Sequence, residues 1–158
     1  MKKVIILAVF LSSCKSVPVP ECSNNYQKPD EEKKWTVQKV YQYLVLHNCY
    51  SPVESTAQVI LESGWDLNGI GHNIIGMHRP TQRPTTNTAQ SGIIAEYSSI
   101  ESSLSDLLMW QCWTGYRSGQ DYFNHLWKYK YNPKINYSMQ IYEITQMPKF
   151  LELIEVLI

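Results

Sequence analysis

The chain has 158 residues, with 14 Lys and Arg side chains and 14 Asp and Glu side chains, so its formal net charge is zero. A chain of this length has room for one domain, and a balanced charge does not favour nucleic acid as a partner. Aromatic residues make up 12 % of the chain and include five Trp, which is typical of a heavily aromatic core or of a groove on which sugar rings stack.

The N-terminal segment predicts an exported lipoprotein. Lys2 and Lys3 precede an apolar run, residues 4–11, that is too short to span a bilayer. The order Leu-Ser-Ser-Cys that ends at Cys14 resembles the bacterial lipobox, in which the cysteine becomes the acylated first residue. We therefore expect a signal peptide over residues 1–13 and attachment to a membrane through lipid on Cys14. The protein would then lie in the cell envelope and face the periplasm or the cell surface. The alternative is an ordinary apolar segment followed by a chance cysteine.

Residues 14–34 predict a flexible tether between the lipid and a domain. Three prolines, many polar residues and hardly any large aliphatic side chains occur in this stretch. Such a composition cannot bury enough apolar surface to offset the entropy of ordering the chain. The domain is therefore expected to begin at residue 35.

Three further cysteines follow Cys14: Cys22, Cys49 and Cys112. Their spacing fits no zinc site, and no metal is expected. Cys49 and Cys112 lie in apolar contexts, so we expect both to be buried thiols. A disulfide between Cys22 and Cys49 is an alternative that the spacing leaves open.

Residues 35–97 predict two helices and then a change of structure. The first helix follows Trp35 and would bury one face, made of Val37, Val40, Tyr41, Leu44 and Val45. The second begins at Ser51-Pro52-Val53-Glu54, a capping box with Pro at the first helical position, and ends at Gly64. Its apolar stripe consists of Val53, Ala57, Ile60 and Leu61. Glycines and prolines interrupt short apolar pieces over residues 65–97, which predicts a small β-hairpin lobe.

The remaining residues predict more helices. A second capping box, Ser98-Ser99-Ile100-Glu101, starts a third helix whose core face holds Ile100, Leu104, Leu107 and Leu108. By default Trp110 and Trp113 are assigned to the core. Helices are also expected around residues 121–128 and 137–146, and a last apolar piece, residues 150–158, follows Pro148. The predicted fold class is mainly α, a helical domain with one small β-hairpin lobe beside a cleft.

Glu62 is the candidate for acid–base chemistry. At about 100° per residue it lies nearly opposite the centre of the apolar stripe, beside Gln58. It is also in the last turn, where the helix dipole disfavours a negative carboxylate by about 0.3–1 kcal/mol and so favours the protonated form. A protonated carboxyl is what a glycosidase needs in order to protonate the leaving oxygen. A solvated Glu at a helix end would show the same pattern.

The residues around Glu62 resemble a known family. Residues 57–65, Ala-Gln-Val-Ile-Leu-Glu-Ser-Gly-Trp, are similar to the helix end Ala-Gln-x-x-Leu-Glu-Ser-Gly-Trp of the glucosaminidase family. That family, the endo-β-N-acetylglucosaminidase-like domain of flagellar muramidases and bacterial autolysins, carries its catalytic Glu there. Further matches follow in family order: residues 72–77 for Asn-Asn-x-Phe-Gly-Ile, residues 97–99 for Tyr-x-Ser, and residues 129–133 for Tyr-Ala-Thr-Asp-Pro. Together they span about residues 35–146.

The resemblance implies a lysozyme-like α+β fold and a peptidoglycan hydrolase that cleaves a β-1,4-linked N-acetylglucosaminyl bond. It assigns the general-acid role to Glu62 and implies that Tyr129 lines the cleft opposite the acid. It also places four residues near the sugar: Asn73, Gly76 and Met77 on a bordering strand, and Trp65, for which packing of the helix end is favoured over contact with sugar. We expect a monomer that acts on peptidoglycan or a related N-acetylglucosamine glycan and needs no cofactor.

The sequence departs from the family in its second acid. Many members have a second acidic residue on the hairpin, whereas no Asp or Glu occurs here between Asp66 and Glu96. Glu96 is therefore the candidate for the second catalytic group, and the substrate's own 2-acetamido group is the alternative. Two other functions stay open: a lytic transglycosylase, in which a sugar hydroxyl attacks, and a non-catalytic glycan-binding lipoprotein.

Overall fold

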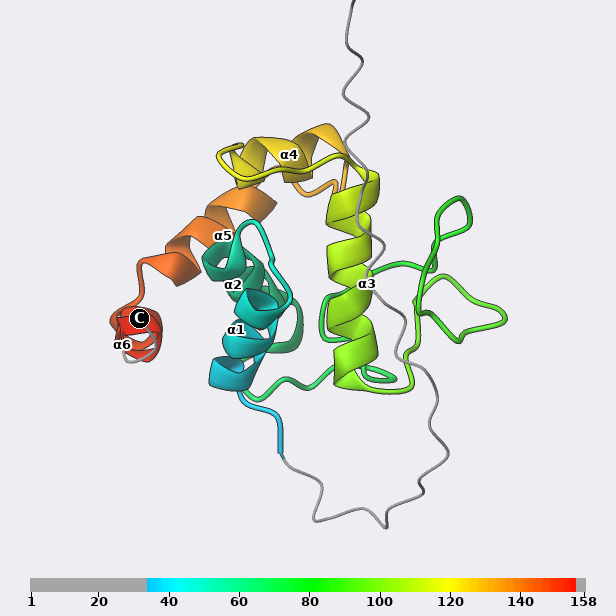
Figure 1. Cartoon of the computed structure of the whole chain (residues 1–158), viewed down its shortest axis with the longest axis horizontal. Coiled ribbons are helices and arrows are strands. Elements are labelled where there is room, and N and C mark those ends of the chain that lie inside the picture. Colours follow the sequence, from blue (N-terminus) through cyan, green and yellow to red (C-terminus); the bar gives the residue numbers. More distant parts are fainter. Residues whose placement is uncertain (1–33, 156–158) are drawn as a thin grey trace, which may run out of the picture. The chain divides into compact units, whose positions relative to one another are not determined.

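The structure, a computed structural model, describes residues 34–155. The predicted signal peptide over residues 1–13, the predicted lipidation site Cys14, Cys22 and almost all of the tether lie outside the described residues. Within them the fold is mainly α, which confirms the predicted class at that level. Six helices follow one another along this part of the chain (Figure 1): α1 Val37–Leu46, α2 Pro52–Ser63, α3 Ile100–Trp113, α4 Tyr122–Lys128, α5 Tyr137–Thr145 and α6 Pro148–Glu155. None of these helices is both long and apolar enough to cross a membrane.

Helix α2 is the central element of the fold. It packs against both α1 and α5, and the six consecutive residues from Ser55 to Ile60 are all buried. A helix that is covered on so many sides keeps only its ends open. Both end turns of α2 are half-buried, and Glu62 lies in the last of them.

The predicted helix starts are found, but the capping boxes are not made as predicted. Helix α2 begins at Pro52, yet the Ser51 side chain caps no backbone N–H and pairs with the hydroxyl of Tyr116. Helix α3 is capped by Ser99, whose hydroxyl accepts from the N–H of Ser102 at 3.2 Å. The sequence patterns thus indicate where both helices begin. In α2, however, the Ser51 hydroxyl bonds to the distant Tyr116 instead of capping the helix.

The predicted β-hairpin lobe is not formed as strands. Residues 65–97 contain two isolated antiparallel bridges, Ile70 with Asn73 and His78 with Ile94. The second bridge consists of the bonds from Arg79 N to Ile93 O (2.7 Å) and from Ala95 N to Met77 O (3.1 Å), and it is not extended into paired strands.

A buried ion pair holds this lobe to α3 instead. Asp106 on α3 is fully buried, and Arg83 donates to its two carboxylate oxygens at 2.8 and 2.7 Å. The Tyr97 hydroxyl and the Thr86 N–H also donate to the Asp106 carboxylate, at 2.8 and 3.3 Å. Burial and the nearby Asp106 carboxylate raise the pKa of Tyr97, so its hydroxyl stays a donor. Both ends of the segment 83–97 are thereby fixed to one carboxylate.

Three core assignments from the sequence are corrected. Trp110 is buried as predicted, but Trp113, one turn further along α3, is 55 % exposed, and Val45 on α1 is also exposed. Cys49 is a buried free thiol beside Ser55, and burial raises the pKa of its thiol. Cys112, in contrast, is exposed. Positions near the end of a helix face solvent where no neighbouring element covers them, which helical spacing alone cannot reveal.

Candidate active site

The Glu62 carboxyl is held at the end of α2 by a tyrosine that is distant in the sequence. Glu62 is half-buried, and the hydroxyl of Tyr137 donates to its Oε1 at 2.6 Å. Tyr137 is the first residue of α5, and the packing of α5 on α2 brings these two helix ends together. The carboxyl therefore has a defined position and does not extend freely into solvent.

Gly76 forms the second contact of this carboxyl. Its backbone has φ of 64°, in the left-handed region that favours glycine. A Cβ atom at this position would lie 2.1 Å from Oε2 of Glu62. The carboxyl thus occupies the space that any other residue at position 76 would fill with its side chain.

Asn73 fixes the turn that carries Gly76. Its Nδ2 donates to the backbone oxygens of Met77 and Ala95, at 2.8 and 2.9 Å, and its Oδ1 accepts from Met77 N at 3.1 Å. The side chain is buried, and both amide hydrogens are used on the main chain. Asn73 therefore acts on the site by positioning Gly76 beside the carboxyl, and it has no hydrogen left to donate to a sugar.

Two stacked tyrosines form the wall beside Glu62. The rings of Tyr131 and Tyr137 are stacked with centroids 6.1 Å apart, and the Tyr131 hydroxyl donates to the backbone oxygen of Ile75 at 2.7 Å. Burial, followed by the neighbouring Tyr131 and the Glu62 carboxylate, raises the pKa of Tyr137 well above its ordinary value. Tyr137 thus keeps its proton and remains the donor to Glu62 at any ordinary pH.

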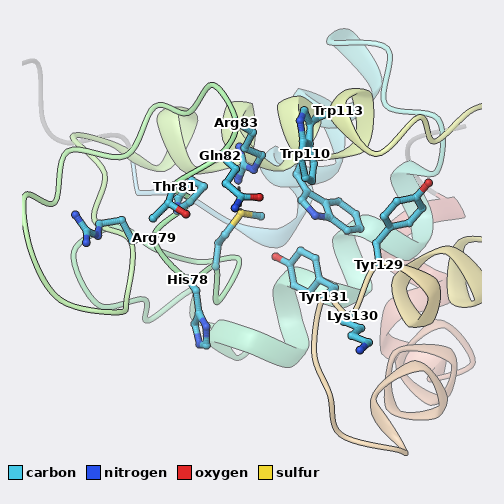
Figure 2. A pocket seen from close by; sticks show the side chains of 12 residues that line it. His78, Arg79, Thr81, Gln82, Arg83, Trp110, Trp113, Tyr129, Lys130 and Tyr131 are labelled. Carbon is cyan, nitrogen blue, oxygen red and sulfur yellow. Dashed lines mark hydrogen bonds between the residues drawn. The ribbon is translucent and has the colours of Figure 1, made fainter.

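A hollow of about 300 Å³ adjoins this wall (Figure 2). It is lined by three stretches of chain: residues 77–83, Trp110 and Trp113 of α3, and residues 129–131. Glu62 is not one of the lining residues. It lies next to the hollow, because Met77 directly follows Gly76 and Tyr131 stacks on Tyr137.

The predicted site residues lie in three places: beside the Glu62 carboxyl, in the lining of the hollow, and away from both. Glu62 and Gly76 form the first group, with Asn73 behind them. Tyr129 and Met77 line the hollow and form the second group; Tyr129 is partly exposed, with its ring 4.5 Å from that of His125.

The remainder consists of Glu96 and Trp65, neither of which lines the hollow. The exposed Glu96 side chain packs against Gly71. The Lys149 ammonium of α6 lies 4.1 Å from the centre of the Trp65 ring, so Trp65 contacts α6 from the end of α2.

The structure gives two residues surroundings that their sequence positions do not predict. Tyr137 was seen only as the start of a helix, although the tyrosine-rich stretch before it was a signal that rings gather there. Gln58 was expected beside Glu62 on an open face, but it is fully buried, and its Oε1 accepts from the hydroxyl of Tyr122. The physical reason is that α2 is covered on more sides than its apolar stripe indicates.

Comparison with protein-family models, with curated proteins and with solved structures gives no significant match to this chain. The assignment of function therefore rests on the residues around Glu62 and on their geometry. Within residues 34–155, no three His, Cys, Asp or Glu side chains gather as the ligands of a metal ion would.

Because Gly76 packs so closely against Glu62, a side chain at position 76 should disturb the carboxyl. We expect the Gly76→Ala variant to lose about tenfold or more in activity on glycan and roughly 1–3 kcal/mol in the free energy of unfolding. The added methyl group displaces the carboxyl from its position beside Tyr137. Kinetic assays and chemical denaturation measure the two effects.

The matched control for this variant is Gly115→Ala. Gly115 has φ of 75°, and a Cβ there would meet no atom within 4 Å. This variant carries a similar backbone strain without the collision, so it is expected to lose stability and keep its activity. Equal activities of the two alanine variants would show that the contact with Glu62 is unimportant.

Proposed function

We propose that the protein is a peptidoglycan hydrolase with a lysozyme-like fold that cleaves a β-1,4-linked N-acetylglucosaminyl bond with Glu62 as its general acid. The observation that carries the proposal is the position of the Glu62 carboxyl. It is half-buried at the open end of the central helix, held by Tyr137 and Gly76, and next to an aromatic-walled hollow. A general acid must be held in one place, and this geometry supports such a role.

The two oxygens of Glu62 have different roles in this mechanism. Oε1 accepts the Tyr137 hydroxyl hydrogen, so the transferable proton resides on Oε2, the oxygen beside Gly76. As the glycosidic C–O bond breaks, its electron pair goes to the leaving oxygen, which takes the proton from Oε2. The sugar becomes an oxocarbenium-like cation. Water then adds to the cation, and its proton returns to the Glu62 carboxylate.

Among residues 34–155, no second carboxylate hydrogen-bonds to Glu62 or lines the hollow. The only side chain that hydrogen-bonds to Glu62 within the described part of the chain is that of Tyr137. Glu96 packs on Gly71 and has an exposed side chain. We therefore favour the substrate's own 2-acetamido group as the stabilising group, with no covalent enzyme intermediate. The same lone acid suits a lytic transglycosylase, in which a sugar hydroxyl replaces water, and this is the second candidate.

We also propose that the protein lies in the cell envelope. Lys2, Lys3, the apolar run after them and the lipobox-like sequence ending at Cys14 support export and attachment to a membrane through lipid. The substrate would then be peptidoglycan within reach of that membrane.

The function is tested by incubating the purified protein with purified insoluble peptidoglycan. Soluble glycan fragments are then measured in the supernatant and bound protein in the pellet. The proposal expects steady release of fragments. Binding to the pellet without any release would identify a non-catalytic glycan-binding protein and would overturn the proposal.

Tyr137→Phe tests how the acid is positioned. Removing the hydroxyl leaves Oε1 of Glu62 without its donor, so kcat is expected to fall about tenfold with little change in KM. The free energy of unfolding should fall by about 1 kcal/mol, the net value of one hydrogen bond. Tyr142→Phe is the matched control, because Tyr142 is an exposed tyrosine on the same helix. A kcat of Tyr137→Phe equal to that of Tyr142→Phe would leave Tyr137 without a role.

Glu96→Gln tests whether a second carboxylate takes part. We expect a loss of about tenfold at most, because the acetamido group of the substrate stabilises the cation and the leaving oxygen still receives its proton from Glu62. Initial rates on the same peptidoglycan preparation measure the effect. A loss as complete as that of Glu62→Gln would establish a paired-carboxylate mechanism in place of the lone acid.

A further inference from the structure

Several large apolar side chains are exposed on α4 and α5, outside the hollow. Trp127 of α4 is 60 % exposed, and Ile135, Met139 and Tyr142, on α5 and the turn before it, are 90, 58 and 49 % exposed. None of the four lines the hollow beside Glu62. A single exposed apolar side chain is normal, whereas several that join into one patch indicate a binding surface.

These side chains join into one patch because α4 and α5 pack together (Figure 1). Met139 and Tyr142 are three residues apart on α5, so they lie on one side of that helix. The ring of Tyr142 contacts that of Phe123 on α4, with centroids 6.2 Å apart, and Trp127 follows Phe123 by one turn. Ile135 precedes Met139 by a similar step along the chain. We call these five residues the α4–α5 face.

The charged side chains close to this face in sequence are lysines. Lys128 and Lys134 are exposed, line no part of the hollow and form no ion pair within residues 34–155. No Asp or Glu occurs between Asp121 and Glu143. The Asp121 carboxylate is occupied as the N-cap of α4, and Glu143 is turned about 100° around α5 from the last residue of the face. The α4–α5 face is therefore apolar with positive charge beside it.

Such a surface suits the headgroup region of an anionic lipid bilayer. Trp and Tyr side chains are enriched where lipid headgroups meet the hydrocarbon, and lysines near them are attracted to anionic headgroups. A second copy of the chain suits the face less well. A twofold contact would bring two sets of Lys128 and Lys134 into one interface, where like charges repel.

The proposed lipid attachment would keep a bilayer within reach of this face. About 20 residues join Cys14 to Lys34, where the described part of the chain begins. A segment of that length spans at most roughly 70 Å. The tether therefore makes binding of the face intramolecular, so that a contact too weak to hold two separate molecules together is sufficient.

We propose that the α4–α5 face binds the surface of an anionic phospholipid bilayer, with its apolar side chains among the headgroups and Lys128 and Lys134 close to anionic lipids. The face gives the protein a membrane contact besides the lipid at Cys14, and it determines which side of the domain faces the membrane. The inference rests on the proposed location in the cell envelope and not on the proposed hydrolase activity.

The test measures whether Trp127 enters the bilayer. The full chain is mixed with vesicles of phosphatidylcholine alone or of phosphatidylcholine with phosphatidylglycerol, each prepared with and without bromine on the acyl chains. Bromine quenches the fluorescence of an indole that lies close to it. Trp127→Phe removes the indole of the face from the signal. Trp113→Phe is the matched control, because Trp113 is an exposed tryptophan that lies in the hollow and not on the face.

We expect bromine to quench the wild type on the vesicles with phosphatidylglycerol, and much less on those without it. Trp127→Phe should abolish this quenching, and Trp113→Phe should leave it unchanged. Lys128→Gln and Lys134→Gln should each lower the ratio of bound to free face roughly fivefold. Lys39→Gln on α1 is their control and should have no effect. Salt at about 1 M should weaken the quenching of the wild type, because it screens the lysines.

Three results would overturn the inference: no quenching on either vesicle, quenching that persists in Trp127→Phe, and equal quenching on both vesicles. A dimer in solution without quenching of Trp127 on vesicles would assign the face to a second copy instead. If Trp127 is quenched as expected but the protein releases no fragments from peptidoglycan, the membrane contact stands and the proposed hydrolase activity falls. The two proposals therefore fail separately.

Discussion

Replacing Glu62 with Gln is expected to lower the rate of peptidoglycan cleavage by about 10²- to 10⁴-fold, the usual contribution of a general acid. The amide has nearly the shape of the carboxyl, and its oxygen still accepts the Tyr137 hydroxyl hydrogen. It has no proton that it can transfer to the leaving oxygen. The fold and the affinity for glycan should therefore persist, which initial rates, thermal unfolding and co-sedimentation with peptidoglycan measure together.

The matched control is Glu152→Gln, which makes the same chemical change on an exposed residue of α6 and should leave all three measurements unchanged. If Glu62→Gln retained more than about a tenth of the activity, Glu62 would be an ordinary residue at a helix end. The hydrogen bond from Tyr137 to Glu62 would then contribute to stability and not to catalysis.

The second large effect is on stability, from the variant Asp106→Asn. Asp106 and the Arg83 side chain are both almost fully buried, with exposed fractions of 0 and 4 %. Removing the negative charge leaves the Arg83 guanidinium buried without its counter-charge, which costs about 3–5 kcal/mol. Since domains of this kind have about 5–15 kcal/mol of stability in all, a large part would be lost. Chemical denaturation is the measurement, and the melting temperature should fall by roughly 10–20 °C.

The double variant Arg83→Met with Asp106→Asn separates charge from packing. It removes the buried cation together with its partner, while the Asn oxygen still accepts from Tyr97 or Thr86. We expect it to be more stable than Asp106→Asn alone. An Asp106→Asn variant within about 1 kcal/mol of the wild type would mean that the ion pair does not hold the segment 83–97 to α3.

Local signals in the sequence predicted most of the helical fold. Proline at the first helical position marked the start of α2 at Pro52, and the 3.6-residue spacing of apolar residues indicated the buried side of α1 and of α3. These signals depend on neighbours within one or two turns, so they can be read from a single sequence. Glu62 was selected as the candidate acid in the same way, from its place in the last turn and its motif.

Features that depend on distant partners could not be predicted. Tyr137 meets Glu62 across 75 residues, and Arg83 meets Asp106 across 23. The structure does not show the predicted hairpin as paired strands; a buried carboxylate that binds Arg83 and Tyr97 fixes residues 83–97, and these long-range contacts cannot be read from local sequence. Glu96 and Tyr129 keep their predicted roles only as hypotheses, since the structure places one on Gly71 and the other in the hollow beside Glu62.

Mass spectrometry of the digestion products shows whether Glu62 drives hydrolysis of a glycan bond. Purified peptidoglycan is digested in parallel with the wild type and with Glu62→Gln, and the ends of the released fragments are identified. We expect the wild type to release fragments with a reducing N-acetylglucosamine end, heavier by one water than the 1,6-anhydro form, and Glu62→Gln to release at least about a hundredfold fewer. Fragments that end in the 1,6-anhydro form would contradict hydrolysis, and equal release by the two proteins would contradict the role of Glu62.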